Sequence, residues 1–481
     1  MLKSISSDQD YLNHLHLNLN TLDTSQKKRL SQPLLKSALH KLKKLRIDLV
    51  SDLLHSLYSS IGRPANDPAI YLRSFVLMQH LGYSSIDSWI NVLLYDSLFQ
   101  FLIGSSIVPN AASHYDFINR LTHDNPHRST LFPKDKNTFT KSKLKKGQKL
   151  ENFKTEDTAS LVDAYSNNPQ FDCDRYSYTL QSLFNAIAVI PSADLGLIDS
   201  HNLTLSGDGS SLHIHANGYG HKIIDDDNAI LTHRFSSPEA DIGWDSDLET
   251  FYFGFSLYNI TYHNPNLGID LPCFISIEKA SRHDALTTIS ASAALFELNP
   301  ELHPTFMCFD SASDNYVTHE FLASKHIIPI IDINCRRKDK NPYHSFESLN
   351  DDGIPFCING NNMVYNGYEA KKHRHKYRCP LAMGKISDCP NKDNCCPTSD
   401  YGKIRYIKSK DDIKLFGPIP YKSEKWKEIY KDRTSTERMN NRILNDYRIH
   451  SMKIRNRAKF LFFSIFAGIN IHLDAQLKCS K

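Results

Sequence analysis

The chain has 481 residues, of which 40% are hydrophobic and 23% are charged, and this composition excludes a disordered protein. A chain of this length can bury a large core and is expected to divide into two to four domains. The formal net charge is only +4, so overall charge does not identify the protein as a nucleic-acid binder, and the positions of the charges carry more information.

Residues 1–125 predict an all-helical domain. Apolar residues recur at a period close to 3.6 from 34 to 58, which indicates one amphipathic helix. Asp67-Pro68 is typical of an N-cap followed by proline at the first helical position, and it begins a helix that runs to about His80. The same patterns predict further helices at 84–95 and 113–121. A domain of this kind fits either helix-turn-helix contact with DNA or dimerisation.

Residues 126–160 form a lysine-rich connection that is punctuated by Gly and Ser. Within it, Lys143, Lys145 and Lys146 are predicted to contact DNA phosphates. A charge run is also typical of a solvated linker, and both interpretations stay open.

Residues 161–334 change to a strand pattern. Aromatic and β-branched runs predict strands at 203–208, 251–258, 271–277, 306–309 and 327–332, with helices at 284–298 and 316–324. Three strands, a helix, a strand, a helix and a strand predict a mixed α/β sheet. The first and fourth of these strands each end in an acid, Asp208 and Asp310.

Residues 335–415 interrupt this pattern and are rich in cysteine. Cys379, Cys389, Cys395 and Cys396 stand close together in the sequence, although without the paired spacing of a zinc ribbon. They fit either one structural Zn²⁺ site or a reduced, metal-free loop.

Residues 416–481 contain the pattern Tyr430-x2-Arg433-x3-Glu437, in a stretch without a helix-breaking residue. These three side chains are therefore expected on one helix face, with Arg433 bracing Glu437 at i, i+4. Two strand-borne aspartates and a third carboxylate on a late helix are the oxygen ligands that two Mg²⁺ (or Mn²⁺) ions need. Together they indicate cutting and rejoining of phosphodiester bonds.

These residues resemble the DDE transposases of bacterial insertion sequences, in the branch with the Tyr-x2-Arg-x3-Glu signature. The resemblance covers most of the chain. Residues 62–120 are similar to that family's N-terminal helical domain. The neighbourhoods of Asp208, Asp310 and Glu437 match its RNase H-like core. Many members carry Lys seven residues after the Glu, and this chain has Leu444 there, with Arg442 close by.

The resemblance implies an RNase H-like mixed sheet with an N-terminal all-helical domain and a Cys-containing insertion before the last catalytic helix. It implies that Asp208, Asp310 and Glu437 are the catalytic residues and hold Mg²⁺. Tyr430, Arg433 and Arg442 are then expected to contact DNA.

The implied partners are double-stranded DNA (terminal inverted repeats and target DNA) and a second copy of the chain in a synaptic complex. Two alternatives stay open. One is a transposase-derived DNA-binding protein without catalysis, and the other is a nuclease without strand transfer.

The N-terminal segment 1–20 is polar and lacks the apolar core of a signal peptide. The longest apolar run, 460–471, is shorter than the roughly 20 residues of a membrane span, so we expect a buried helix and no membrane contact. The ten cysteines are then expected to be reduced thiols or metal ligands. The expected location is the cytoplasm, in contact with the nucleoid.

Overall fold

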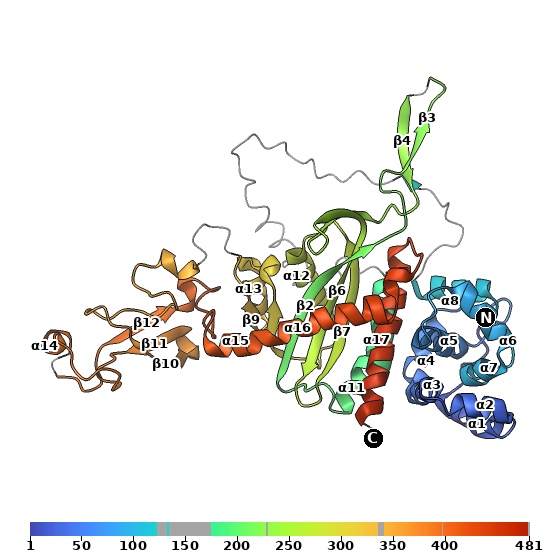
Figure 1. Cartoon of the computed structure of the whole chain (residues 1–481), viewed down its shortest axis with the longest axis horizontal. Helices are drawn as coiled ribbons and strands as arrows, with labels where there is room; N and C mark the ends of the chain where they lie inside the picture. The colour runs from blue at the N-terminus through green and yellow to red at the C-terminus, as the bar shows by residue number, and fades with distance from the viewer. Residues whose placement is uncertain (123–131, 134–174, 228, 335–340, 397, 480–481) are drawn as a thin grey trace.

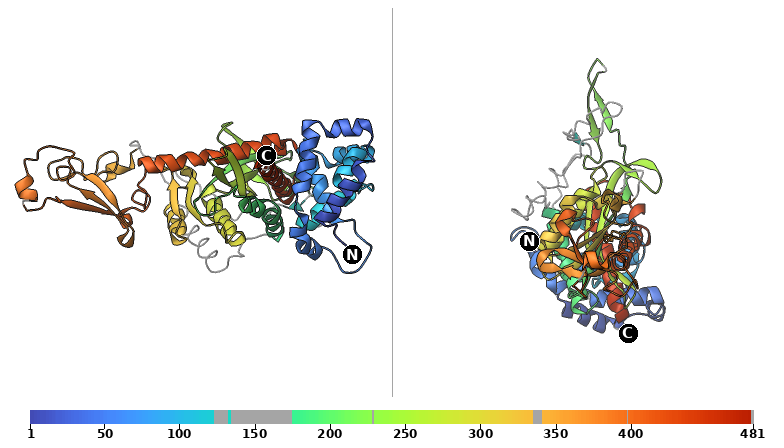
Figure 2. Two further views of the ribbon diagram at one scale, coloured as in Figure 1. Left: turned by 90° about the horizontal axis from the view of Figure 1, so that it is seen from below. Right: turned by 90° about the vertical axis from the view of Figure 1, so that its left-hand side faces the viewer.

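The computed structural model describes residues 1–122, 132–133, 175–227, 229–334, 341–396 and 398–479. The protein is elongated, with the N-terminal helices at one end, a mixed sheet in the middle and the insertion at the other end (Figures 1 and 2). Lys143, Lys145 and Lys146 lie outside the described residues. The chain is therefore a mixed α/β protein with a helical end.

The N-terminal end is helical, as predicted. Its elements are α1 (Asp8–Leu19), α2 (Thr24–Leu30), α3 (Pro33–Lys44), η1 (Ile47–Val50), α4 (Ser51–Ser56), α5 (Pro68–His80), α6 (Ile86–Tyr95), α7 (Ser97–Ile103) and α8 (Ala111–Thr122). The prediction of one helix over 34–58 is wrong. The backbone of Leu45 is extended and ends α3, and the Asp8 carboxylate accepts a hydrogen bond from the Ile47 amide at 2.9 Å in the turn that follows.

The central sheet has its longest strands in β2 (Leu203–His213), β6 (Thr250–Asn264) and β7 (Ile269–Lys279). They are joined by β5 (Asp241–Asp245), β8 (Pro304–Phe309) and β9 (Ile328–Ile331). The strand order is β5-β6-β2-β8-β9, and β7 also pairs with β6. The pairs β2–β6, β6–β7 and β5–β6 are antiparallel, whereas β2–β8 and β8–β9 are parallel.

A projecting hairpin between β2 and β5 was not predicted. It consists of β3 (His221–Ile224) and β4 (Ile230–Phe235), and β4 also pairs with β1 (Phe132–Pro133) (Figure 1). These strands and β5 are short, and β3 is mostly exposed to solvent. They therefore lack the apolar runs from which the other strands were predicted.

Helices pack against the central sheet. α12 (Asp284–Leu298) and α13 (Tyr316–Ser324) connect β7, β8 and β9 in turn, with the bounds that the sequence predicted. α15 (Glu424–Tyr430), the 3-10 turn η7 (Lys431–Arg433), α16 (Thr434–Asn441) and the π-helical turn η8 (Arg442–Asp446) follow one another directly, and α16 contacts β2, β6 and β7. Further helical elements are α10 (Arg175–Phe184), the π-helical turn η2 (Asn185–Val189), α11 (Ile190–Asp194), η3 (Ser311–Ser313) and η9 (Ile449–Ser451).

The last helix, α17 (Arg457–Cys479), joins the sheet to the N-terminal helices. The His472 ring lies 2.8 Å from the Pro272 carbonyl oxygen on β7, while Gln79 of α5 donates to the Phe463 carbonyl at 2.8 Å. Among the described residues α17 is the one helix long and apolar enough to cross a membrane, and 89% of its apolar window is buried in the protein. It is a core helix, as expected.

The insertion forms a second, smaller sheet. Its strands β10 (Val364–Glu369), β11 (Arg374–Arg378) and β12 (Ile404–Lys408) are antiparallel in that order. Helical turns η4 (Pro342–Ser345), η5 (Ala370–Lys372), α14 (Lys392–Cys395) and η6 (Ser409–Asp411) lie in its connections. Its buried residues form a cluster with Cys308 and Ile330 of the central sheet and Trp426 of α15, separate from the main core.

Candidate functional site

The two predicted aspartates lie on neighbouring parallel strands. Ser206 of β2 is in register with Cys308 of β8, and each aspartate, Asp208 and Asp310, stands two residues further along its strand direction. Asp310 follows the last residue of β8 and caps η3 by accepting a hydrogen bond from the Ala312 amide at 3.0 Å. Asp208 was predicted at the end of a strand, but β2 continues to His213 because it keeps its antiparallel pairing with β6.

A third acid, Asp284, joins this pair and was not predicted. It is the first residue of α12, after the N-cap His283. A Cβ atom added to Gly209 of β2 would lie 3.0 Å from Asp284 Oδ1, so this carboxylate packs on β2 at the residue after Asp208, on the face of the strand opposite to the Asp208 side chain. An acid in the first turn of a helix is ordinary in itself, since it interacts favourably with the helix dipole. The sequence therefore gives no separate signal for this residue.

Neighbouring aspartates raise the pKa values of both Asp208 and Asp284. Burial, Asp310 and Asp284 together raise the pKa of Asp208 to about 7, against the opposing effect of the Arg433 guanidinium. Burial and Asp310 raise the pKa of Asp284 to about 6. Negative charge is thus concentrated in a poorly solvated place, where a cation would bind favourably.

Arg433 links this cluster to Glu437. Its guanidinium lies 2.6 Å from Glu437 Oε1 and 3.6 Å from Asp208 Oδ2. The predicted i, i+4 brace is therefore present, and the same side chain also reaches the sheet. Glu437 is more open to solvent than Asp208, with 51% of its side chain exposed against 19%.

The other predicted DNA-contacting residues have protein partners. The Tyr430 ring stacks on Trp426 with ring centroids 4.4 Å apart, and the Arg433 guanidinium lies 5.8 Å from the Tyr430 centroid. Arg442 lies 3.7 Å from an oxygen of Asp474 on α17. Leu444 is buried in the main core. It stands at the position where the resemblance led us to expect Lys. An apolar residue at this position therefore serves packing.

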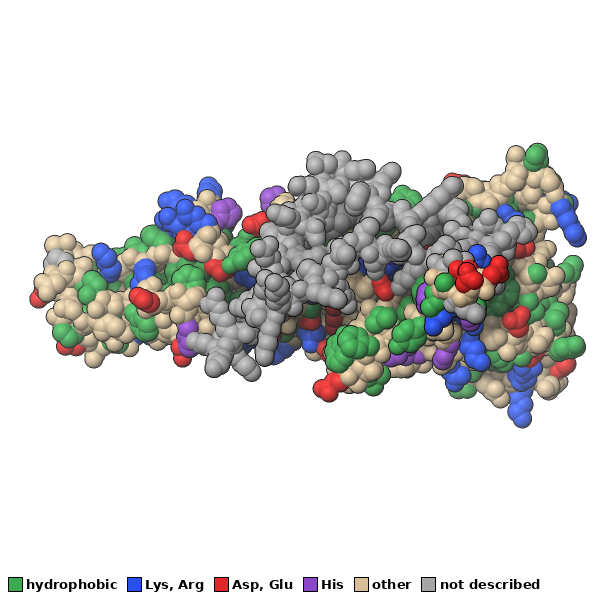
Figure 3. All heavy atoms as spheres, turned by 90° about the horizontal axis from the view of Figure 1, so that it is seen from above, with side chains coloured by type: hydrophobic (Ala, Val, Ile, Leu, Met, Phe, Trp, Pro, Cys, Tyr) green, Lys and Arg blue, Asp and Glu red, His purple; other side chains and the backbone are tan. Residues whose placement is uncertain are grey.

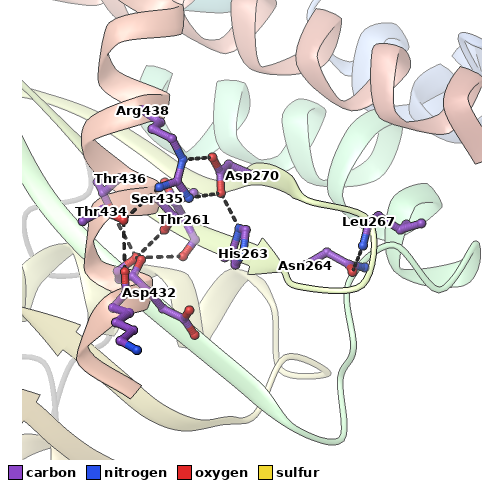
Figure 4. A network of polar contacts seen from close by, with 12 residues as sticks. Thr261, His263, Asn264, Leu267, Asp270, Asp432, Thr434, Ser435, Thr436 and Arg438 are labelled. Atoms are coloured by element: carbon purple, nitrogen blue, oxygen red, sulfur yellow. Dashed lines mark hydrogen bonds and ion pairs between the residues drawn. The ribbon is translucent and has the colours of Figure 1, made fainter. Parts of the chain in front are cut away.

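A hydrogen-bond network fastens α16 to the sheet and so fixes Arg433 and Glu437 (Figure 4). Arg438 binds Asp270 of β7 through two bonds of 2.6 and 2.8 Å, and Asp270 also binds His263 of β6 at 2.7 Å. On β2, the Ser206 hydroxyl lies 2.7 Å from the Ser435 hydroxyl and donates to the Asp432 carbonyl at 3.1 Å. Bidentate and buried polar contacts of this kind hold a helix at a defined place on a sheet.

The acidic side chains of this site have the donor type for a metal ion but not yet the arrangement. In the part of the chain that the structure describes, no three His, Cys, Asp or Glu side chains are placed to hold one ion. At the aspartates the donor type fits a hard divalent cation, because all candidates are carboxylate oxygens in a site with excess negative charge. Glu437 is bound to Arg433 instead, so this pair would have to separate for Glu437 to become a ligand.

The predicted cysteine cluster meets around one small pocket of about 20 Å³ in the insertion. Cys379, Cys389, Cys395 and Cys396 line it, and so does Cys357, which the sequence had not grouped with them. Burial raises the pKa of Cys395, and the neighbouring thiols of Cys396 and Cys379 raise it further, so these thiols lie close together. Thiols are donors that suit Zn²⁺, and the pocket has space for one water-sized ligand, so zinc binding here remains a prediction. In their present positions the described thiols do not converge on one point.

Comparison with protein-family models and with curated protein sequences gives no match to this chain. The functional conclusion therefore rests on the arrangement of the residues themselves.

Proposed function

We propose that the protein is a DDE transposase that cleaves DNA strands and joins them to a target, with an RNase H-like core. The observation that carries this proposal is the aspartate pair. Asp208 lies on β2 and Asp310 directly follows the neighbouring parallel strand β8, in a site where burial and the neighbouring acids raise the pKa of Asp208 to about 7. A cluster of buried carboxylates is the type of site that binds a divalent cation, which the proposed phosphodiester chemistry requires.

The strand arrangement supports the RNase H-like part of the proposal. Five strands of the central sheet follow one another in the chain as β2, β6, β7, β8 and β9. In the sheet they lie side by side in the order β7-β6-β2-β8-β9, and β6 is antiparallel to the other four. The acids come from the first and fourth of these strands and from a helix that packs on the same sheet.

Each residue has a definite role in this proposal. Asp208 and Asp310 would hold the cations, and Glu437 would be a further ligand once its ion pair with Arg433 is broken. When bound, Mg²⁺ or Mn²⁺ would activate the attacking oxygen and stabilise the leaving oxygen. Arg433, freed from Glu437, is then able to bind a DNA phosphate through its planar guanidinium. Tyr430 supports Arg433 through its stack on Trp426.

The proposed partners are the inverted repeats at the ends of a mobile element and target DNA. Two ends must be brought together, which requires at least a homodimer of the chain. Lys143, Lys145 and Lys146 would add phosphate contacts, each contributing about −0.9 to the slope of log affinity against log salt. The proposed location is the cytoplasm, at the nucleoid.

Duplex DNA from either side of the coding region, incubated with the protein and Mg²⁺, tests the proposal. A transposase gives both cleaved ends and products in which those ends are joined to a second DNA. Cleavage without joining would instead indicate a nuclease, and binding without cleavage a DNA-binding protein. The absence of both binding and cleavage would contradict all three.

A further inference from the structure

The small sheet of the insertion has two unlike faces. Residues along β11 alternate between them, so His375 and Tyr377 are buried against the insertion core at 0% and 4% exposure. Arg374, Lys376 and Arg378 occupy the other, outward face. Three cations therefore stand at every second position of one strand, roughly 6.8 Å apart along it.

Two tyrosines hold these cations in place. The Arg374 guanidinium lies 3.5 Å from the centroid of Tyr406, and that of Arg378 lies 3.4 Å from the centroid of Tyr401. Lys376 donates a hydrogen bond of 2.6 Å to the Tyr401 hydroxyl. Cation–π contacts of this kind fix a long side chain without removing its charge. The row of cations is therefore ordered before any ligand binds.

The surroundings of this face are also basic. Exposed lysines close to the three strands are Lys371, Lys372, Lys403, Lys408 and Lys410. The acids of the same region are fewer: Glu369 binds Arg374 at 2.8 Å, Asp411 accepts from the Lys408 amide, and Asp400 is exposed. Figure 3 shows one group of Lys and Arg side chains at the upper edge of the left-hand part of the molecule, with single Lys or Arg side chains elsewhere on that part. The face thus carries an excess of positive charge.

We propose that this outward face of β11 and β12 is a second DNA-binding surface, which grips the phosphate backbone of a duplex away from the acidic site. The inference rests on the proposed function, because it requires DNA as the partner. A regular row of ordered cations complements a chain of phosphates, which carries one negative charge per nucleotide. Contacts to phosphates position a duplex without reading its sequence.

The test measures binding of the full-length protein to a 30-base-pair duplex of arbitrary sequence, by fluorescence anisotropy over a series of salt concentrations. EDTA is present, so that cleavage plays no part. The double variant Lys376→Gln/Arg378→Gln should bind more weakly at low salt. Its slope of log affinity against log salt should be smaller by about 0.9 for each phosphate that the variant no longer neutralises. Lys376→Arg/Arg378→Lys keeps both charges and should retain most of the wild-type slope.

The matched control is Lys427→Gln, which removes an exposed lysine of α15 that pairs with Glu424 and is not part of β11 or β12. It should leave the slope unchanged. A double variant with the wild-type slope would overturn the inference while leaving the proposed function intact. Wild-type protein that binds no duplex DNA would overturn both.

Discussion

Two regions of this molecule gather metal-binding types of residue, and they do so in opposite ways. The acidic site draws Asp208, Asp284 and Asp310 from separate strands and a helix of the central sheet, and the neighbouring acids raise the pKa values of Asp208 and Asp284. The cysteine pocket draws its thiols from one short part of the chain, mostly in loops of the insertion. Long-range topology positions the acids, whereas local sequence positions the thiols.

The way in which the acids and the thiols are positioned determines which role each region suits. Carboxylates held on strands and helices are placed by the whole fold, which suits a site that must meet a substrate with defined geometry. Thiols in loops can close around an ion and thereby order the loops, which suits a structural role. We therefore assign chemistry to the acidic site and, at most, stability to the cysteine pocket.

The largest effect is expected from removing an acid. Asp208→Asn, Asp310→Asn and Glu437→Gln should each lower metal-dependent strand cleavage by at least about a hundredfold, because the amide keeps the shape and removes the charge. DNA binding measured in EDTA should persist. Glu424→Gln removes an exposed carboxylate of α15 that pairs with Lys427, and it should cleave normally. Near-normal cleavage by an acid variant would exclude that residue from the site.

Asp284 should matter less, because we assign it to positioning and charge rather than to direct ligation. We expect Asp284→Asn to lower the affinity for Mn²⁺ by about tenfold, in the range found for groups that support metal ligands. Asp432→Asn is the matched control, since that half-buried acid interacts with His263, Arg438 and Asp270 on the other side of α16. Equal Mn²⁺ affinities in the two variants would mean that Asp284 only interacts with the dipole of its own helix.

The cysteine pocket gives the sharpest contrast with the acids. If it holds zinc, the purified protein should carry about one equivalent of Zn²⁺, measured by elemental analysis. Ser in place of Cys379, Cys389 or Cys395 should lower the zinc content and the melting temperature. Cleavage by protein that stays folded should not change. Cys479→Ser, at an exposed thiol near the end of α17, should alter neither quantity. Zinc-free wild-type protein of equal stability would establish a metal-free loop.

The smallest effect is a change of stability with pH. The folded-state pKa values of Asp208 (about 7) and Asp284 (about 6) lie above the value near 3.9 of an unfolded chain. The folded protein then binds more protons than the unfolded one, so its free energy of unfolding should fall as pH rises from about 4 to about 7. Without metal, this loss should be measurable in urea titrations at a series of pH values, and Asp208→Asn should reduce it. Asp226→Asn, in an exposed loop, should keep the wild-type slope.

Much of the fold was predictable because apolar periodicity reports directly on burial. The bounds of α12 and α13 were obtained from the sequence, and so was the N-cap Asp67 of α5, whose side chain accepts from the Ala69 amide. The split between α3 and α4 was not predictable, because it depends on the Asp8 carboxylate from a distant segment. Strands β3 to β5 were missed because they are short and lack a continuous apolar run.

The same distinction applies to the candidate site. The contact between Arg433 and Glu437 is local and follows from helical spacing, so the sequence predicted it. The packing of Asp284 on Gly209 joins a helix to a strand that is distant in the chain. Pairing of this kind depends on tertiary structure, and a single sequence does not report it.

The central claim is that the acidic site, and not the cysteine pocket, binds the divalent ions of the reaction. Titration of the zinc-saturated protein with Mn²⁺, followed by electron paramagnetic resonance in the presence of duplex DNA, tests it most directly. The account predicts at least one bound Mn²⁺ in wild-type protein, at least tenfold weaker binding in Asp208→Asn and Asp310→Asn, and no change in Cys389→Ser. Equal Mn²⁺ affinity in wild-type protein and both aspartate variants would contradict it.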